Sequence, residues 1–450
     1  MRTVTDTRYW IWLAVALDYG SPALLPLLEH FGDAEGVFHA SQDALSEVKA
    51  LHAAERKKLA NHDLSRAEEV AEYCMHAGVR VLTVADEDYP RSLLAIKNPP
   101  AILYMRGALP DWNRLPCIGV VGARAMSYYG ASSACEISYD LARMGCITVS
   151  GIALGIDGVV AAATLEAGGK TIAVLGSGID RLYPREHKKL YNAILAGGGA
   201  IITEFPPYEG SNAFHFPLRN RIISGISKAL ILVEGDAKSG ALITARCAKK
   251  QGKCLFAVPG KINDKNSEAP LLLLKGGAKV LTCADDVYDN FGEEYFSSIN
   301  PFALLPKTFL NLETVLRKYG VSAGREKPKE KKLLDPHADA EEKTPLIERI
   351  RGLFSTETKM TKVSPKVDRE TSKETLTGDR RQILDEERRN LLDKAQYALY
   401  EQLSYDEPRH PDQLAGEGDV GNVASMLVIM EMLGCVTLAA GGSYLKNENQ

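Results

Sequence analysis

Short, uninterrupted apolar runs recur through the middle of the chain and alternate with stretches of helical periodicity. Runs of four or five residues that are continuous in Ala, Val, Ile and Leu are typical of strands covered on both faces. We therefore expect an α/β domain built on a doubly wound, mostly parallel sheet. The predicted strands are residues 117–121, 147–150, 171–175, 200–203, 229–233, 254–258 and 279–282.

The first 72 residues have a different pattern, in which apolar positions recur at helical spacing in short segments. The pattern predicts helices at residues 10–17, 22–31, 34–40 and 53–64. Ser21 and Ser41 stand where helices begin, while Gly20 and Gly32 stand where they end. Residues 1–72 therefore read as a small helical domain.

Beyond the predicted sheet the apolar pattern fades and then returns. Residues 322–389 are rich in Lys, Glu, Asp, Thr and Pro, which predicts a flexible charged linker. Residues 390–450 predict helices near 391–403, 411–415 and 420–433, followed by two short strands, as in a winged-helix domain. The third helix carries no Lys or Arg, so we favour a protein-interaction role over major-groove reading.

Ligands of a doubly wound sheet bind at the carboxyl ends of its strands. Three predicted loops there contain Gly122, Gly151 and Gly176, which would let a ligand approach the backbone. Arg124 stands where a dinucleotide fingerprint has its second glycine, and a bulky cation there obstructs the pyrophosphate position. This loop is therefore interpreted as holding a nucleic-acid phosphate rather than NAD, and no cofactor is expected.

Residues 216–225 (FPLRNRIISG) predict the start of a further helix, because Pro217 suits a first turn. The guanidinium groups of Arg219 and Arg221, with Asn220, then lie near a helix N-terminus, which favours an anion. Phe216 offers a face on which a base can stack. The competing interpretation has Phe216 in the core and the arginines paired with Glu204 or Glu234, and local chemistry does not separate the two.

Basic residues outnumber acidic ones between residues 214 and 254, which predicts a basic groove. Within it Gly240 opens a helix that ends near Lys250, and both are assigned to the groove. A solvated helix face explains Lys249, Lys250 and Lys253 about equally well. Asp157, at the start of another predicted helix, is interpreted as its N-cap.

Net charge, cysteine spacing and hydropathy limit the kinds of site and partner that the chain can have. The 450 residues carry a formal net charge of −4, so a polyanion site must be a local basic patch. The eight cysteines form no C-x-x-C pair and no cluster with His, so we expect reduced thiols and no metal site. The sequence shows no signal peptide and no apolar run of membrane-spanning length, which predicts a cytoplasmic protein without a membrane partner.

A set of motifs occurs in fixed order around residues 216–225. They are Val121-Gly-Ala-Arg124, Ser150-Gly-Ile-Ala-Leu-Gly-Ile-Asp157, Ala173-Val-Leu-Gly-Ser-Gly178, Tyr183-Pro184, Glu234, Ser239-Gly240 and Ala257-Val-Pro-Gly260. With them, residues 78–292 resemble the DNA-processing protein family called DprA or Smf.

The resemblance implies a Rossmann-like DNA-binding domain at residues 78–292 and an N-terminal region like a sterile-alpha-motif or helix-hairpin-helix domain. It also implies a homodimer that binds and protects single-stranded DNA and helps load a RecA-type recombinase in natural transformation. No catalytic residues are expected.

Two other functions compete with this one. Related Rossmann-like proteins cleave nucleotide N-glycosidic bonds, and Glu204 or Glu234 could supply a carboxylate, but the chain lacks a Pro-Gly-Gly-x-Gly-Thr signature and a nucleophile–base pair. A transcription factor acting through the winged helix is disfavoured by the uncharged third helix.

Overall fold

The computed structural model describes residues 4–290 and 310–322 and, beyond residue 384, parts of the chain up to residue 447. The chain divides into two compact units, Met1–Lys329 and Glu330–Gln450, and each is described by itself.

The first unit begins with short helices, and α1 packs against α3, α5 and α6. Ser41 caps α4 as predicted, and Gly32 ends α2 with a positive φ. The sequence analysis missed α6, because its buried face consists of small residues within a charged segment. The bounds are α1 Val4–Ala16, α2 Leu24–Phe31, α3 Ala34–Phe38, α4 Gln42–Glu47, α5 Ala53–Leu59 and α6 Ser65–His76.

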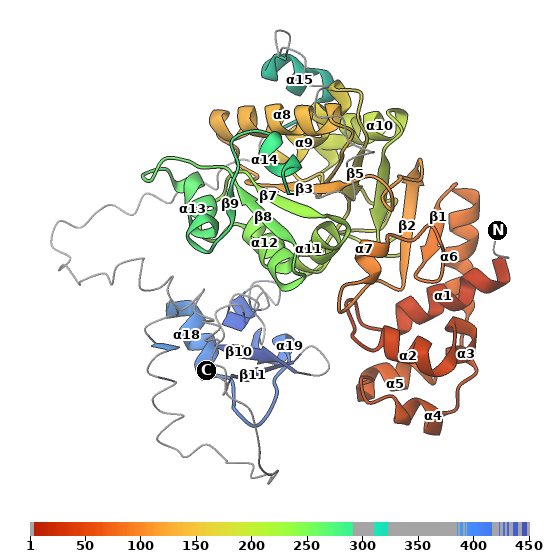
Figure 1. Cartoon of the computed structure of the whole chain (residues 1–450). Helices are drawn as coiled ribbons and strands as arrows, with labels where there is room; N and C mark the ends of the chain where they lie inside the picture. Colours follow the sequence, from red (N-terminus) through yellow and green to blue (C-terminus); the bar gives the residue numbers. More distant parts are fainter. Residues whose placement is uncertain are drawn as a thin grey trace, which may run out of the picture. The chain divides into compact units, whose positions relative to one another are not determined.

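A mixed sheet forms the centre of this unit (Figure 1). Among the described residues it has nine strands, in the order β1-β2-β6-β5-β4-β3-β7-β8-β9. Strands β3 to β9 pair in parallel, whereas β2 pairs antiparallel with both β1 and β6. The strands are β1 Arg80–Thr83, β2 Ile102–Gly107, β3 Cys117–Val121, β4 Ile147–Ser150, β5 Thr171–Val174, β6 Ala200–Thr203, β7 Ala229–Leu232, β8 Cys254–Ala257 and β9 Lys279–Val280.

The predicted α/β class and the mostly parallel, Rossmann-like sheet are confirmed. Each predicted strand is present within two residues of its expected ends. The pattern did not predict that β1 and β2 would extend the sheet with antiparallel strands, because neither run shows which neighbour it pairs with.

Helices cover both faces of the sheet (Figure 1). On one face α8, α9, α10 and α15 pack together, and on the other α11 packs against α7 and α12. Between the layers lies one continuous apolar core, which also includes side chains of the N-terminal helices. The bounds are α7 Arg91–Leu94, α8 Tyr128–Arg143, α9 Ile156–Glu166, η1 Arg185–His187, α10 Lys188–Ala196, α11 His215–Ile226, α12 Gly240–Lys250, η2 Lys265–Ser267, α13 Glu268–Lys275, α14 Asp285–Tyr288 and α15 Leu312–Tyr319.

In the second unit the structure describes α18 (Lys394–Glu401), α19 (Pro411–Ala415) and the antiparallel pair β10 (Val436–Leu438) and β11 (Tyr444–Lys446). These elements have an apolar core of their own, centred on Leu399, Tyr400 and Leu403. The predicted pair of short strands is therefore present. The predicted linker at 322–389 and helix at 420–433 fall largely outside the described residues.

Candidate functional site

The candidate site lies at the carboxyl edge of the parallel strands, where the chain reverses its direction through the sheet. From β3 the chain adds β4, β5 and β6 on one side, and then β7 on the other side of β3. Helices α8 and α12, which follow β3 and β7, cover opposite faces, so the loops after these strands diverge, and ligands of such sheets bind at this point. Arg124 lies in the loop after β3, beside this switch point.

The predicted glycines have two different surroundings. A Cβ atom would lie 2.7 Å from the Ile156 side chain at Gly122, and 2.6 Å from the Arg219 guanidinium at Gly151. At Gly176 it would lie 3.0 Å from the Phe216 ring, whereas at Gly240 nothing lies within 4 Å. Gly122, Gly151 and Gly176 therefore make room for the protein's own side chains, and of the four glycines only Gly240 leaves open space beside the backbone.

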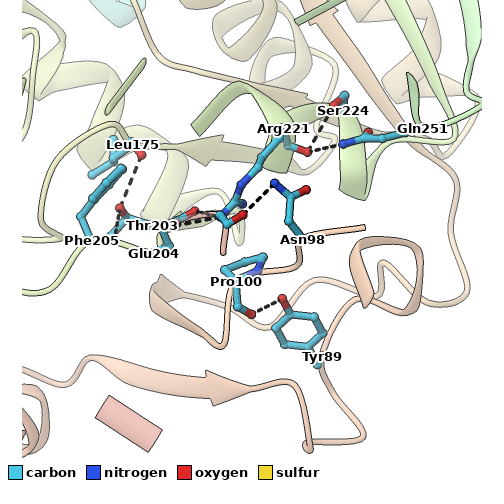
Figure 2. Close-up of polar contacts among 11 residues, drawn as sticks. Tyr89, Asn98, Pro100, Leu175, Thr203, Glu204, Phe205, Arg221, Ser224 and Gln251 are labelled. Carbon is cyan, nitrogen blue, oxygen red and sulfur yellow. Dashed lines mark hydrogen bonds and ion pairs between the residues drawn. The ribbon is translucent and has the colours of Figure 1, made fainter. Parts of the chain in front are cut away.

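Arg221 is held by an ion pair inside the protein, as the competing interpretation allowed. Its Nη2 lies 2.9 Å from Glu204 Oε1 and 2.7 Å from Oε2, and both residues are buried (Figure 2). Burial raises the pKa of Glu204, and the neighbouring Arg221 opposes this rise. A phosphate could reach Arg221 only by breaking this buried ion pair, so the geometry favours the competing interpretation over the predicted phosphate contact.

Arg219 is also buried, and it connects the ends of two parallel strands. Its Nη1 donates hydrogen bonds to the carbonyl oxygen of Gly151, at 3.0 Å, and to that of Val174. Its Nε donates to Asn220 Oδ1 at 3.2 Å, and burial lowers the Arg219 pKa to about 10. Arg219 and Asn220 therefore hold the floor of the site in place.

Arg124 is an exposed cation at the site. Its guanidinium carbon lies 5.2 Å from the centroid of the Phe216 ring, and that of Arg219 lies 5.9 Å away. The centroid of the Tyr183 ring lies 5.8 Å from that of the Phe216 ring, and the two ring planes are tilted by 52°. The sequence motif contains Tyr183, but nothing in the pattern indicates that its ring joins this cluster. The fold thus places the exposed guanidinium of Arg124 and the exposed ring of Tyr183 around the half-buried ring of Phe216.

The two glutamates that could serve an enzyme have structural partners. Glu204 pairs with Arg221, and Glu234 accepts hydrogen bonds from Ser127 N at 2.8 Å and Ser127 Oγ at 2.6 Å. Burial raises the pKa of Glu234, and the bonds from Ser127 oppose the rise. Ser127 also caps α8 by accepting from Gly130 N, so Glu234 fixes the start of α8 beside the Arg124 loop.

Asp157 does not cap its helix. The N-cap of α9 is Gly155, and Asp157 lies in the first turn. Its carboxylate instead accepts hydrogen bonds from Gly151 N at 3.1 Å and Ala153 N at 3.4 Å. The carboxylate therefore fixes the turn between β4 and α9, and its N-cap interpretation was wrong because the chain enters the helix two residues earlier.

Lys250 is not brought to the carboxyl edge. Helix α12 begins at Gly240 beside the site and ends at Lys250, and a helix of this length spans about 15 Å. Lys228 and Lys253, which precede β7 and β8, likewise belong to the amino edge of the sheet. The predicted basic groove is therefore divided between two edges, because the helix separates residues that are close in sequence.

Two further features concern metals and membranes. Within the part of the chain that the structure describes, Asp18, His52 and Glu55 form a group whose ligand atoms lie within 4.8 Å of one another. Lys58 pairs with Asp18, and His52 with Glu55, each at 2.8 Å. None of the helices described here is long and apolar enough to cross a membrane.

The fold and the site define an α/β protein of the Rossmann-like class, with a cation and aromatic rings at the switch point of its sheet. A family model described as DNA recombination-mediator protein A matches residues 80–292. DNA processing protein DprA of Bacillus subtilis is 37% identical over 225 residues, which are 50% of this chain and 75% of that protein. Protein Smf of Escherichia coli is 43% identical over 204 residues, covering 45% of this chain and 54% of that protein.

Among solved structures, DNA processing protein A of Streptococcus pneumoniae matches with a TM-score of 0.56 and 31% identity, covering 65% of this chain and 99% of that one. The chain therefore belongs to the DprA/Smf family of DNA processing proteins, as its motifs predicted.

Proposed function

We propose that this chain binds single-stranded DNA at the carboxyl edge of its sheet, protects it, and helps load a RecA-type recombinase in natural transformation and homologous recombination. The observation that carries the DNA site is the exposed guanidinium of Arg124 beside the ring of Phe216. A cation next to an aromatic ring offers both contacts that single-strand binding uses, a phosphate contact and a stacking surface. Membership of a family of DNA processing proteins supports this proposal.

Within the site the predicted residues take different roles. Arg124 contacts phosphate, Phe216 stacks a base, and the open space at Gly240 admits the strand near the start of α12. Arg219, Asn220, Gly151 and Gly176 support these contacts from below, while Gly122 packs against α9. Arg221 and Lys250 contribute no direct contact.

The test of the DNA site is a comparison of labelled single-stranded and double-stranded DNA of one sequence, measured by fluorescence anisotropy. We expect the purified protein to bind the single strand more tightly, because bases in a duplex are unavailable for stacking. Equal affinity for both, or no binding of the single strand, would contradict the proposal.

We also propose that the protein is not an enzyme. Hydrolysis of a nucleotide glycosidic bond needs a carboxylate that is free to act on substrate or water. Glu204 is paired with the buried Arg221, and Glu234 accepts hydrogen bonds from the half-buried Ser127. Incubation with nucleoside monophosphates should therefore release no free base. Base release that is lost in Glu204→Gln or Glu234→Gln would favour the hydrolase instead.

Three further proposals rest on the family resemblance. The protein forms a homodimer, it contacts a RecA-type recombinase, and residues 390–450 form a winged helix that serves protein interaction. The β10–β11 pair supports the winged helix. Light scattering of the purified chain tests the dimer, and pull-down with the recombinase by full-length and 1–329 chains tests the other two proposals.

A further inference from the structure

The ring of Tyr183 is exposed and adds little to the apolar core. Its relative exposure is 49%, and no described residue offers its hydroxyl a hydrogen-bond partner. A single exposed aromatic side chain is ordinary on a protein surface. Tyr183 differs because, in the described part of the chain, its ring contacts that of Phe216, at 5.8 Å between centroids.

Phe216 itself is only partly open. Gly176 closes on one edge of its ring, and the guanidinium groups of Arg124 and Arg219 lie 5.2 and 5.9 Å from its centroid. The half-buried ring therefore has room for few partners beyond those that already surround it. The more accessible aromatic surface of the cluster belongs to Tyr183.

We propose that Tyr183 is a second base-stacking residue, which takes the nucleotide next to the one stacked on Phe216. The inference rests on the proposed binding of single-stranded DNA and assigns a specific contact within it. Successive bases of a single strand stack on neighbouring aromatic side chains without regard to sequence, since every base has a π-face.

The proposed contact is distinct from that of Arg124. A ring contributes stacking and no charge, so removing it should weaken binding without changing the number of neutralised phosphates. Tyr208 provides a matched control, because its exposure is 44% but its ring contacts Tyr73 at 5.0 Å and Arg66 at 5.9 Å. Both tyrosines are exposed enough for replacement by alanine to leave the fold intact.

The experiment measures anisotropy of a labelled oligothymidine with wild type, Tyr183→Ala, Tyr183→Phe and Tyr208→Ala across a salt series. We expect Tyr183→Ala to weaken binding roughly 5- to 100-fold with an unchanged salt slope. The phenylalanine variant keeps the ring and should stay within about twofold of wild type, as should Tyr208→Ala.

A second strand with the same backbone but without bases separates stacking from other effects. Tyr183→Ala and wild type should bind this abasic strand equally. An equal loss on both strands, a full effect in Tyr183→Phe, or an unchanged affinity in Tyr183→Ala would overturn the assignment of Tyr183 alone. Absence of single-strand binding by wild type would overturn the proposed function as well.

Discussion

Arg124 and Arg221 carry the same charged group, but their surroundings give them different roles. Arg221 is buried and paired with the carboxylate of Glu204, whereas Arg124 is exposed above Phe216. A buried charge whose partner is removed is strongly destabilising, while an exposed charge is free to meet a ligand. The two arginines therefore predict two separable phenotypes, one in binding and one in stability.

Replacing Arg124 with alanine should weaken single-strand binding and flatten its salt dependence. Each neutralised phosphate contributes about 0.7 to the slope of log affinity against log salt. We expect the slope to fall by about that amount in Arg124→Ala, and to change little in Lys250→Ala, which lies at the far end of α12. Anisotropy at several salt concentrations measures both slopes, and equal losses in the two variants would contradict the site.

Replacing Arg221 with alanine should lower the free energy of unfolding by about 3–5 kcal/mol, because it leaves the Glu204 carboxylate buried and unpaired. Chemical denaturation measures the loss. The double variant Arg221→Met with Glu204→Met removes both charges and should recover most of it. A single variant as stable as wild type would show that the ion pair is not structural.

At the scale of elements, His187 joins three segments that are distant in sequence. It is fully buried at the end of η1, and its Nδ1 lies 2.9 Å from the carbonyl oxygen of Ile152, in the loop before α9. Its Nε2 accepts a hydrogen bond at 3.2 Å from the backbone N–H of Ser322, just beyond α15. Ser322 in turn accepts from Gly155 N at 2.9 Å. These bonds require a neutral imidazole with its proton on Nδ1.

The stability contributed by His187 should therefore depend on pH. Burial lowers its pKa in the folded protein, while Asp157 and Glu186 oppose the shift, and an unfolded histidine titrates near about 6.5. Because the folded pKa is the lower one, this stability is fully present above pH about 6.5 and is lost as the pH falls through 6.5 toward the folded value.

Denaturation at pH 7.5 to 5.5 tests this prediction by comparing wild type with His187→Gln. As the pH falls, the free energy of unfolding of wild type should decrease by up to about 1.4 kcal/mol per pH unit more than that of the variant. His215 is also buried, but it is present in both proteins, so its effect cancels in the comparison. Replacement of the exposed His76 by Gln is the control, and this variant should show the same pH profile as wild type. Parallel profiles for wild type and His187→Gln would contradict the assignment.

The same scale shows what sequence could and could not predict. The parallel strands could be predicted from the sequence, because burial on both faces leaves no polar position in a run such as Ala229–Leu232. The role of Arg221 could not be predicted, since an arginine near a helix start looks the same whether it faces Glu204 or solvent. Lys250 was misplaced because charge counts along a chain ignore the length of the intervening helix. The contact between the rings of Tyr183 and Phe216 could not be predicted either, because the two residues are distant in sequence and are brought together only by the fold.

At the scale of the whole molecule the chain forms two compact units, divided between Lys329 and Glu330. The division falls inside the segment that composition marks as a charged linker at residues 322–389. Brief limited proteolysis should cut this segment first and leave a large N-terminal and a small C-terminal fragment, because cleavage concentrates where few contacts hold the backbone. Mass spectrometry locates the cuts, and a first cut inside residues 4–290 would oppose this two-unit organisation.

The apolar core of the first unit runs without a break from the N-terminal helices, at Tyr9 and Trp12, into the sheet and on to Val315 in α15. The apolar side chains of residues 1–72 therefore share one core with those of the sheet, within one compact unit. Because the helices and the sheet bury these side chains together, loss of the helices would expose part of the sheet's apolar core to water. We therefore expect a chain that begins at residue 78 to expose apolar side chains of the sheet that the N-terminal helices cover, and to aggregate more readily than the full chain.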